Sequence, residues 1–480
     1  MKRLLSLSFT VCLAAIGCSV EPSKQANRNA SDSPAPASRV SPAPSPISEK
    51  TANAQRLTLP VLDAFFADES FSGLLKTRLQ LTDDQITKLR ELAHSETAKL
   101  NEANSGQTQG ETAAAQAAAE EKVKAVIGEE KTQQLTLLVR ERWSGAAENA
   151  SDKSPATGPE DSAVNVVNGV PTDSRIVVNA PAFRMDVFDG GRLIKTYRIG
   201  IGYPQFPLPT GLRKARAIIF NPTWTPPDEP WVEKMKNINV GEKVEAGSKL
   251  NPLGPIKIPI GMPSLIHGGK SPAKLGTFAS HGCVGLTSPQ VRDFARVLAE
   301  LGGTHLTDEE ITGYARDQTK TKQLKLSKPV PVELRYETIV AEDGKLHIYR
   351  DVYDQDTNTE EILRAVLEAN GVKIDDLTAA ELTQVLDTLT QMSGKSSTPL
   401  RPAALSRQSP TPATSPTPGE LPIGKKAIAR SKAPRSAKNQ KEIVIEITAL
   451  KGKGYPAAVD LDTGVGRRKT TLASKVITQP

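Results

Sequence analysis

The stretch SLIHGGKSPAKLGTFASHGCVGLTS, Ser264–Ser288, decides how this chain is interpreted. It contains Cys283, the only cysteine after residue 18, and two of the five histidines, His267 and His281. A free thiol has a pKa of about 8.5, so it needs a neighbouring base to become a nucleophile at neutral pH. A histidine can be that base. Gly282 leaves the backbone beside the cysteine uncrowded, so that amide N–H groups could face a developing oxyanion.

Three interpretations of this stretch are open. A lone cysteine is usually buried and inert, but here an apolar strand, Ser264–Ile266, leads into two histidines and several glycines. A metal site formed by His267, His281 and Cys283 would use ligand types that zinc accepts, although the sequence offers no evident fourth ligand. Nucleophilic catalysis by Cys283 accounts for the whole pattern. The sequence therefore predicts a cysteine-dependent active site without a metal or another cofactor.

The pattern resembles the signature of the L,D-transpeptidases, the YkuD-domain family. I-H-G at Ile266–Gly268 and S-H-G-C-V at Ser280–Val284 carry the resemblance, and supporting similarity runs from about Ser174 to Asp356. The supporting motifs are P-T-G at Pro209–Gly211, F-N-P-T-W-T-P-P from Phe220, N-P-L-G at Asn251–Gly254 and D-G-K-L-H-I-Y-R-D-V-Y from Asp343.

The resemblance assigns roles to the residues of the motif. It implies that Cys283 is the nucleophile and that His267 is its base, oriented by the carbonyl of Gly268. It also implies that His281, with the backbone of Gly282 and Cys283, shapes the oxyanion site. The expected site residues are Cys283, His267, His281, Gly282, Ser280 and Gly268.

One position departs from the family pattern. The family usually has arginine two residues after the cysteine, where this chain has Gly285. Arg292, in an expected helix, is a candidate to supply the missing charge.

The implied reaction is acyl transfer between peptidoglycan stem peptides. Cys283 would attack the bond between an L-centred residue and a terminal D-amino acid, and an amine of a neighbouring stem peptide would resolve the thioester. Two alternatives stay open. Water could be the acceptor, which would make the protein an L,D-carboxypeptidase. The chain could instead be a non-catalytic lipoprotein that binds the cell wall, with Gly285 marking lost activity.

The composition predicts a multidomain chain. Its 480 residues are too many for one core, only 4% are aromatic, and its 36 prolines concentrate in a few tracts. We expect a β-rich, L,D-transpeptidase-like catalytic domain, β-sandwich-like with short helices, flanked by small helical modules and disordered linkers. The expected segments are a signal peptide at 1–17, a tether at 18–55, a helical hairpin module at 56–143, a linker at 144–173, the catalytic domain at 174–358, a helical appendage at 359–394, a basic Pro/Ser-rich linker at 395–441 and a small β segment at 442–480.

The N-terminus has the pattern of an export signal. Lys2 and Arg3 precede an apolar run, Leu4–Ile16, that is short for a membrane span. Ala15–Cys18 resembles a lipobox, which implies cleavage before Cys18 and lipid on its sulfur, although ordinary signal peptidase could cut the same bond. We expect a protein of the cell envelope, on the periplasmic or extracytoplasmic side and anchored to the membrane by that lipid.

Local signals place several helices and strands. Thr82 is an expected N-cap, Gln290–Leu301 an expected helix ended by Gly302, and Thr378–Glu381 a capping box. Between Thr223 and Gly254 lies a long segment carrying Trp224 and Trp231, which could flank an extended ligand or anchor the core. The expected strands include Ile176–Val178, Phe183–Phe188, Leu193–Ile199, Ala217–Phe220 and Ile256–Ile260.

A basic segment lies near the C-terminus. Lys425–Lys441 has seven basic residues and no acidic one, and it contributes to the net charge of +7. In an exported chain such a segment would meet anionic envelope polymers or lipid head groups, and we expect no nucleic acid as a partner. A solvated linker that binds nothing is the alternative.

Overall fold

The computed structural model describes residues 57–100, 111–143, 167–228, 230–233, 235–393 and 440–461. The expected signal peptide, Cys18 and the tether lie outside the described residues, as do most of the linker at 144–173 and nearly all of the basic segment. Within the described ranges, no helix combines the length and apolar character needed to cross a membrane.

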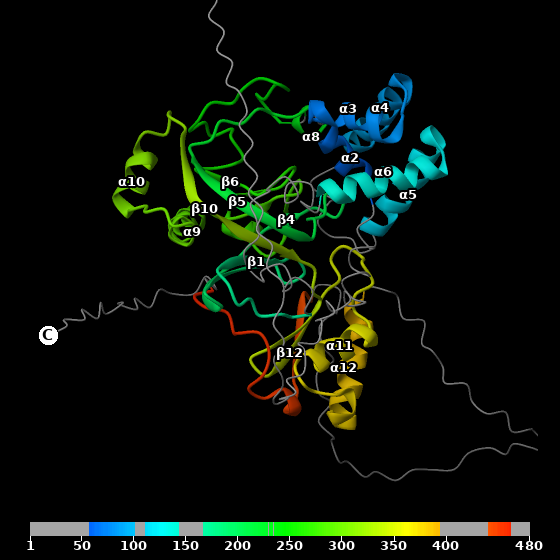
Figure 1. Ribbon diagram of the computed structural model, residues 1–480, viewed down its shortest axis with the longest axis vertical. Helices are drawn as coiled ribbons and strands as arrows, with labels where there is room; N and C mark the ends of the chain where they lie inside the picture. The colour runs from blue at the N-terminus through cyan, green and yellow to red at the C-terminus, as the bar shows by residue number, and fades with distance from the viewer. Residues whose placement is uncertain are drawn as a thin grey trace, which may run out of the picture. The chain divides into compact units, whose positions relative to one another are not determined.

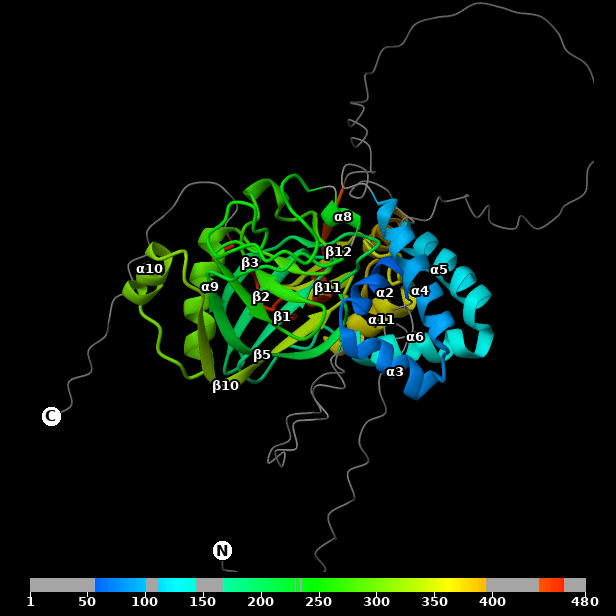
Figure 2. The same ribbon diagram turned by 90° about the horizontal axis from the view of Figure 1, so that it is seen from above.

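The N-terminal part of the described chain is a five-helix module with its own core. Its elements are α2 (Leu59–Phe66), α3 (Glu69–Leu79), α4 (Asp83–Ala98), α5 (Glu111–Ile127) and α6 (Glu129–Trp143), which gather as one cluster in Figure 2. The expected N-cap is confirmed, because the Thr82 hydroxyl and the Gln85 side chain cap α4 reciprocally. Phe65, Phe71 and Leu135 are at most 1% exposed in this core. The module therefore has more helices than the expected hairpin.

The main sheet has eight strands in the order β3-β2-β1-β10-β5-β6-β7-β9. Their bounds are β1 Arg175–Asn179, β2 Arg184–Asp189, β3 Arg192–Arg198, β5 Gly211–Phe220, β6 Ile256–Pro259, β7 Leu265–His267, β9 Val284–Gly285 and β10 Lys322–Arg335. The expectation of a β-rich domain is confirmed. The strands form one mixed sheet instead of two facing sheets, because the long β10 pairs with β1 on one side and with β5 on the other. A separate parallel pair joins β4 (Ile201–Gly202) to β8 (Phe278–Ser280).

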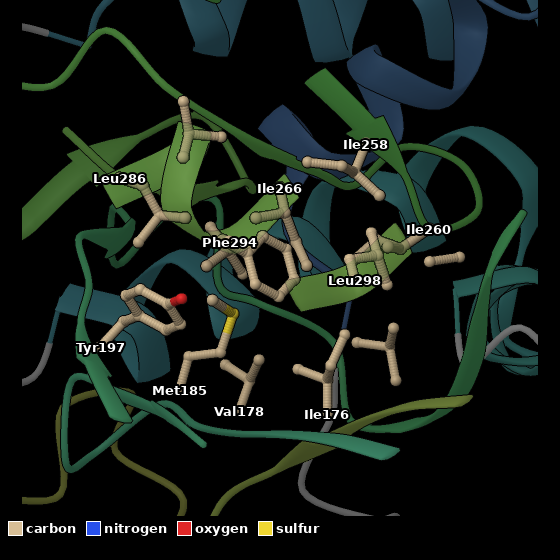
Figure 3. Packing of buried hydrophobic residues seen from close by; sticks show 14 of the residues in the cluster. Ile176, Val178, Met185, Tyr197, Ile258, Ile260, Ile266, Leu286, Phe294 and Leu298 are labelled. Atoms are coloured by element: carbon tan, nitrogen blue, oxygen red, sulfur yellow. The ribbon is translucent and has the colours of Figure 1, made fainter. Parts of the chain in front are cut away.

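Helix α9 (Ser288–Leu301) packs its apolar face against this sheet. It begins two residues earlier than expected, because Thr287 and Gln290 form a capping box. Phe294 and Leu298 are fully buried, and Figure 3 shows them among side chains from β1, β2, β6 and β7. Figure 1 shows α10 (Asp308–Arg316) following α9 on the same side of β10.

A second small sheet has its own helices. It has the order β11-β12-β13, with β11 at Ile339–Glu342, β12 at Lys345–Tyr349 and β13 at Glu442–Glu446. Helices α11 (Glu360–Ala369) and α12 (Ala379–Met392) cover it and share its core, beside β12 in Figure 1. The expected capping box at Thr378 is present. The C-terminal strand is thus paired with a strand about ninety residues earlier in the chain, and β11 and β12 share a core with α11 and α12.

The long segment after Phe220 contains a small core of its own. Trp224 is 9% exposed and clusters with Val232, Ile238 and Leu253 around the one-turn helix α8 (Pro230–Glu233). This burial favours the anchoring role for Trp224. Three short 3-10 helices complete the described elements, at Pro272–Lys274, Ile374–Asp376 and Thr448–Leu450.

Candidate active site

The two halves of the motif meet through a parallel strand pair. Strand β7 ends at His267, and β9 begins directly after Cys283. The register pairs Ile266 with Val284 and His267 with Gly285, so I-H-G and S-H-G-C-V come to neighbouring strand ends. The backbone there approaches α9 closely, because a Cβ on Gly268 would lie 2.7 Å from Cγ1 of Val291.

His267 is held as a neutral imidazole. Its Nδ1 lies 2.7 Å from the carbonyl oxygen of Gly268, which can only accept, so Nδ1 carries the proton and Nε2 the lone pair. Burial is the main cause that lowers the pKa of His267 to about 3, and the positive charge of Lys270 is the second, while the carbonyls of Gly268 and Leu253 act in the opposite direction. The ring is therefore ready to accept a proton at neutral pH.

Ser280 fixes the backbone of the cysteine. Its Oγ donates to the carbonyl of Cys283 at 2.5 Å and accepts the N–H of Cys283 at 3.0 Å. Ser280 is 4% exposed, whereas Cys283 is half-buried and belongs to no disulfide. The sequence offered the serine only as part of the motif, and the structure gives it this bracing contact.

The same contact changes the expected oxyanion site. Because the N–H of Cys283 is already bonded to Ser280, it does not point to an open position. Gly282 has φ of +90°, and a side chain on it would meet no atom within 4 Å. Of the two backbone donors expected from the sequence, the amide of Cys283 is thus bonded within the protein.

His281 is half-buried and packs against two aromatic rings. The centroids of Tyr203 and Phe206 lie 5.2 and 4.9 Å from the centroid of its ring, both edge-on. Burial lowers the pKa of His281 to about 3, and the charge of Lys270 adds to the effect. The sequence did not point to either aromatic residue, because both lie about eighty residues before His281 and outside the motifs that carry the family resemblance.

Lys270 fills the space beside Gly285. A Cβ on Gly285 would lie 2.8 Å from Cγ and 2.9 Å from Cε of Lys270, so the lysine stem crosses the place where a side chain at 285 would begin. Its positive charge lowers the pKa of His267 and of His281. The sequence suggested Arg292 as the cation that replaces the family arginine. The cation beside Gly285 is instead Lys270, which lies within Ser264–Ser288.

The described residues do not gather a metal site. No three or more His, Cys, Asp or Glu side chains among them converge as a metal ion would require. The arrangement that is present combines a thiol, a neutral histidine with a defined tautomer and a nearby cation. Such a set can perform nucleophilic acyl transfer through a thioester.

Residues 173–324 match the family model of the YkuD L,D-transpeptidase catalytic domain. Similar solved structures include an L,D-transpeptidase from Mycobacterium smegmatis (14% identity, 34% of this chain, 58% of that chain, TM-score 0.20). A mutant of the Enterococcus faecium enzyme is also similar (16% identity, 34% of this chain, 50% of that chain, TM-score 0.20). So is the catalytic domain of the E. faecium enzyme (18% identity, 35% of this chain, 100% of that chain, TM-score 0.20). This chain covers only 58% and 50% of the two longer ones, and no curated protein matches it. The assignment rests on the family model alone: residues 173–324 match the L,D-transpeptidase catalytic domain family, and the segments on either side lie outside the match.

Proposed function

We propose that this protein is a peptidoglycan L,D-transpeptidase that uses Cys283 as its nucleophile and His267 as its general base. The observation that best supports this role of His267 is the hydrogen bond from its Nδ1 to the Gly268 carbonyl, which leaves Nε2 as the proton acceptor. The family match of the surrounding residues supports the substrate class.

The reaction begins with proton transfer from the Cys283 thiol to His267 Nε2. The sulfur attacks the carbonyl carbon of the stem-peptide bond before the terminal D-amino acid, and the Gly282 amide faces the oxyanion. The leaving amine takes the proton from His267, and a thioester remains on Cys283. The amine of a neighbouring stem peptide then attacks the thioester, gives a proton to His267, and releases the new amide as the thiolate recovers that proton.

Reaction with a carbapenem tests the nucleophile and the base. We expect stoichiometric acylation of Cys283, located by peptide mapping, and none in Cys283→Ser. His267→Ala should slow acylation about 10²- to 10⁴-fold, the usual contribution of a general base. His281→Ala should slow it less, because that residue supports the site. Fast acylation in His267→Ala would refute the assigned base, and no acylation of folded wild-type protein would favour the non-catalytic wall-binding alternative.

Crosslink analysis decides between the two acceptors. Peptidoglycan from cells that express the active protein should gain crosslinks that are absent with Cys283→Ser. Shortened stem peptides without new crosslinks would identify an L,D-carboxypeptidase.

We also propose that the enzyme is exported and anchored by lipid on Cys18. The charged start, the apolar run and Ala15–Cys18 support this localisation. Intact-mass measurement of the membrane fraction should find an acylated mature chain. An unacylated chain beginning at the same residue would indicate an ordinary secreted enzyme.

A further inference from the structure

A tight turn stands between the five-helix module and the active site. The turn Tyr203–Phe206 is closed by the N–H of Phe206, which donates to the carbonyl of Tyr203 at 2.8 Å. Its outer residues, Tyr203 and Phe206, are 5% and 2% exposed and pack against His281. Its two central residues, Pro204 and Gln205, present their carbonyls to the module.

Each of those carbonyls accepts a hydrogen bond from a fully buried threonine of the module. Thr58, which precedes α2, donates to the Gln205 carbonyl at 2.7 Å. Thr112, in the first turn of α5, donates to the Pro204 carbonyl at 2.9 Å. Both threonines are 0% exposed, so an unmade bond there would leave a buried polar group without a partner.

Two further contacts fix α5 at this place. The side-chain amide of Gln205 donates to the Glu111 carboxylate at 2.9 Å. The Asp354 carboxylate accepts the backbone N–H of Thr112 at 3.1 Å and that of Ala113 at 3.4 Å, at the end of the helix that favours an anion. Gln205 and Asp354, which both lie outside the module, therefore bind the first turn of α5.

The turn is packed directly on the backbone that carries the nucleophile. Tyr203 N–H donates to the Ser280 carbonyl at 2.9 Å. A Cβ on Gly202 would lie 3.2 Å from the Cα and N of Gly282, and 2.0 Å from the carbonyl oxygen of Phe206. The backbone at Gly202 and the backbone at Gly282 are packed without room for a side chain between them, so a displacement of the turn must displace His281 or Gly282.

We propose, resting on the function proposed above, that the five-helix module, residues 57–100 and 111–143, is a positioning element of the active site. Thr58 and Thr112 are its positioning residues: their hydroxyls hold the Tyr203–Phe206 turn, and the turn holds His281 and Gly282 beside Cys283.

Variants that remove only the hydroxyls test this assignment. Thr58→Val/Thr112→Val keeps the side-chain shape and deletes both donors, whereas Thr58→Ser/Thr112→Ser keeps the donors. The serine pair is needed because Thr58 also caps α2 by accepting the N–H of Val61 at 3.3 Å. Thr132→Val is the matched control, since that hydroxyl is part-buried and donates to the Gly128 carbonyl at 2.7 Å inside the same module.

The readouts are carbapenem acylation of the full chain and the imidazole NMR shifts of His281. Loss of two buried hydrogen bonds should slow acylation by the valine pair about tenfold, while the serine pair and Thr132→Val stay near the wild-type rate. At about pH 6, where the wild-type ring is neutral, the valine pair should show a partly protonated His281. If the module contacts the turn but does not position the active site, the acylation rate and the His281 imidazole shifts will not change in the valine pair.

Three results would overturn the assignment. The valine pair could match Thr132→Val in both rate and spectrum, the serine pair could be as slow as the valine pair, or the His281 signal could stay fixed in every variant. A wild-type protein that is not acylated at all would instead count against the proposed function. In that case the His281 spectrum alone still decides whether the turn depends on the two hydroxyls.

Discussion

The low pKa of His267 predicts an unusual pH dependence for acylation of Cys283. The perturbation is a change of buffer from about pH 7 to about pH 5, within the range where an ordinary histidine with a pKa of about 6.5 gains its proton. Burial and the charge of Lys270 hold the pKa of His267 at about 3. The imidazole therefore stays neutral over the whole interval and keeps its ability to accept the thiol proton.

The expected difference is large enough to measure easily. A base with a pKa of about 6.5 is about 75% neutral at pH 7 and about 3% neutral at pH 5, so its rate would fall about 25-fold. With a pKa of about 3, His267 is about 99% neutral at pH 5, and the rate should fall by less than about twofold. A pKa one unit higher would still leave about nine-tenths of the rings neutral.

Stopped-flow measurement of carbapenem absorbance gives the rate directly. Two carbapenems with different ionisable groups should give the same profile, which separates the titration of the protein from that of the reagent. A fall centred near about pH 6.5 would refute the reasoning, because it would mean that the base is solvated. A rate that rises as the imidazole gains a proton would point to a resting thiolate–imidazolium pair instead of the neutral pair.

The same pKa has a consequence for stability. Between about pH 6.5 and pH 3 residue 267 binds a proton in the unfolded chain but not in the folded protein. The free energy of unfolding therefore falls as the pH falls. At about pH 5 the cost from His267 is about 2 kcal/mol. The loss measured by denaturant unfolding between pH 7 and pH 5 should therefore be smaller in His267→Gln, and an equal loss in both proteins would contradict the burial of the ring.

Three further perturbations follow from other charges and contacts. Lys270→Met should raise the pKa of His267 and of His281, measured by NMR titration, because its charge lowers both; Lys274→Met, at an exposed position, is the control, and an unchanged pKa would exclude the charge effect. Asp63→Asn should stabilise the helical module by up to about 3 kcal/mol at neutral pH, because burial raises the pKa of Asp63 to about 6. The gain in unfolding free energy should vanish below about pH 4, where the carboxyl group is protonated in both states. A destabilised variant would show that the contacts of the carboxylate outweigh the cost of its burial. Tyr455→Phe should lower the free energy of unfolding by about 1 kcal/mol, since its hydroxyl donates to the buried Asp186 at 3.2 Å, and no change would mean that this bond contributes nothing.

Features set by neighbouring residues could be predicted from the sequence. The caps at Thr82 and Thr378 each depend on side chains three residues apart, and both form as expected. The motif halves also come together, since a short strand ending at His267 and another beginning after Cys283 need only one parallel pairing. Helix α9 begins two residues before the predicted start at Gln290, because Thr287 and Gln290 form a capping box.

Features that depend on distant pairing could not be predicted in this way. Strand β13 is apolar enough to be recognised, but nothing local in Glu442–Glu446 says that it pairs with Lys345–Tyr349. The long β10 likewise merges strands that local patterns would divide between two sheets. The contacts of Thr58 and Thr112 with the turn at Pro204 and Gln205 join residues about 90 to 150 positions apart, and a buried threonine has no local signal for such a partner.

The charge of Lys270 acts on both members of the proposed thiol–imidazole pair. A fixed cation disfavours an imidazolium, so it opposes proton transfer to His267, and it favours a thiolate, so it assists the loss of that same proton. These two effects offset each other while the proton moves within the pair. Attack on the substrate carbonyl moves the negative charge from the sulfur to the oxyanion and leaves the imidazolium in place, so the net charge of the site does not change. The effect of Lys270 on the rate therefore depends on which of the two charges lies nearer its ammonium: slower acylation in Lys270→Met would mean that the cation acts mainly on the oxyanion, and faster acylation that it acts mainly on the imidazolium.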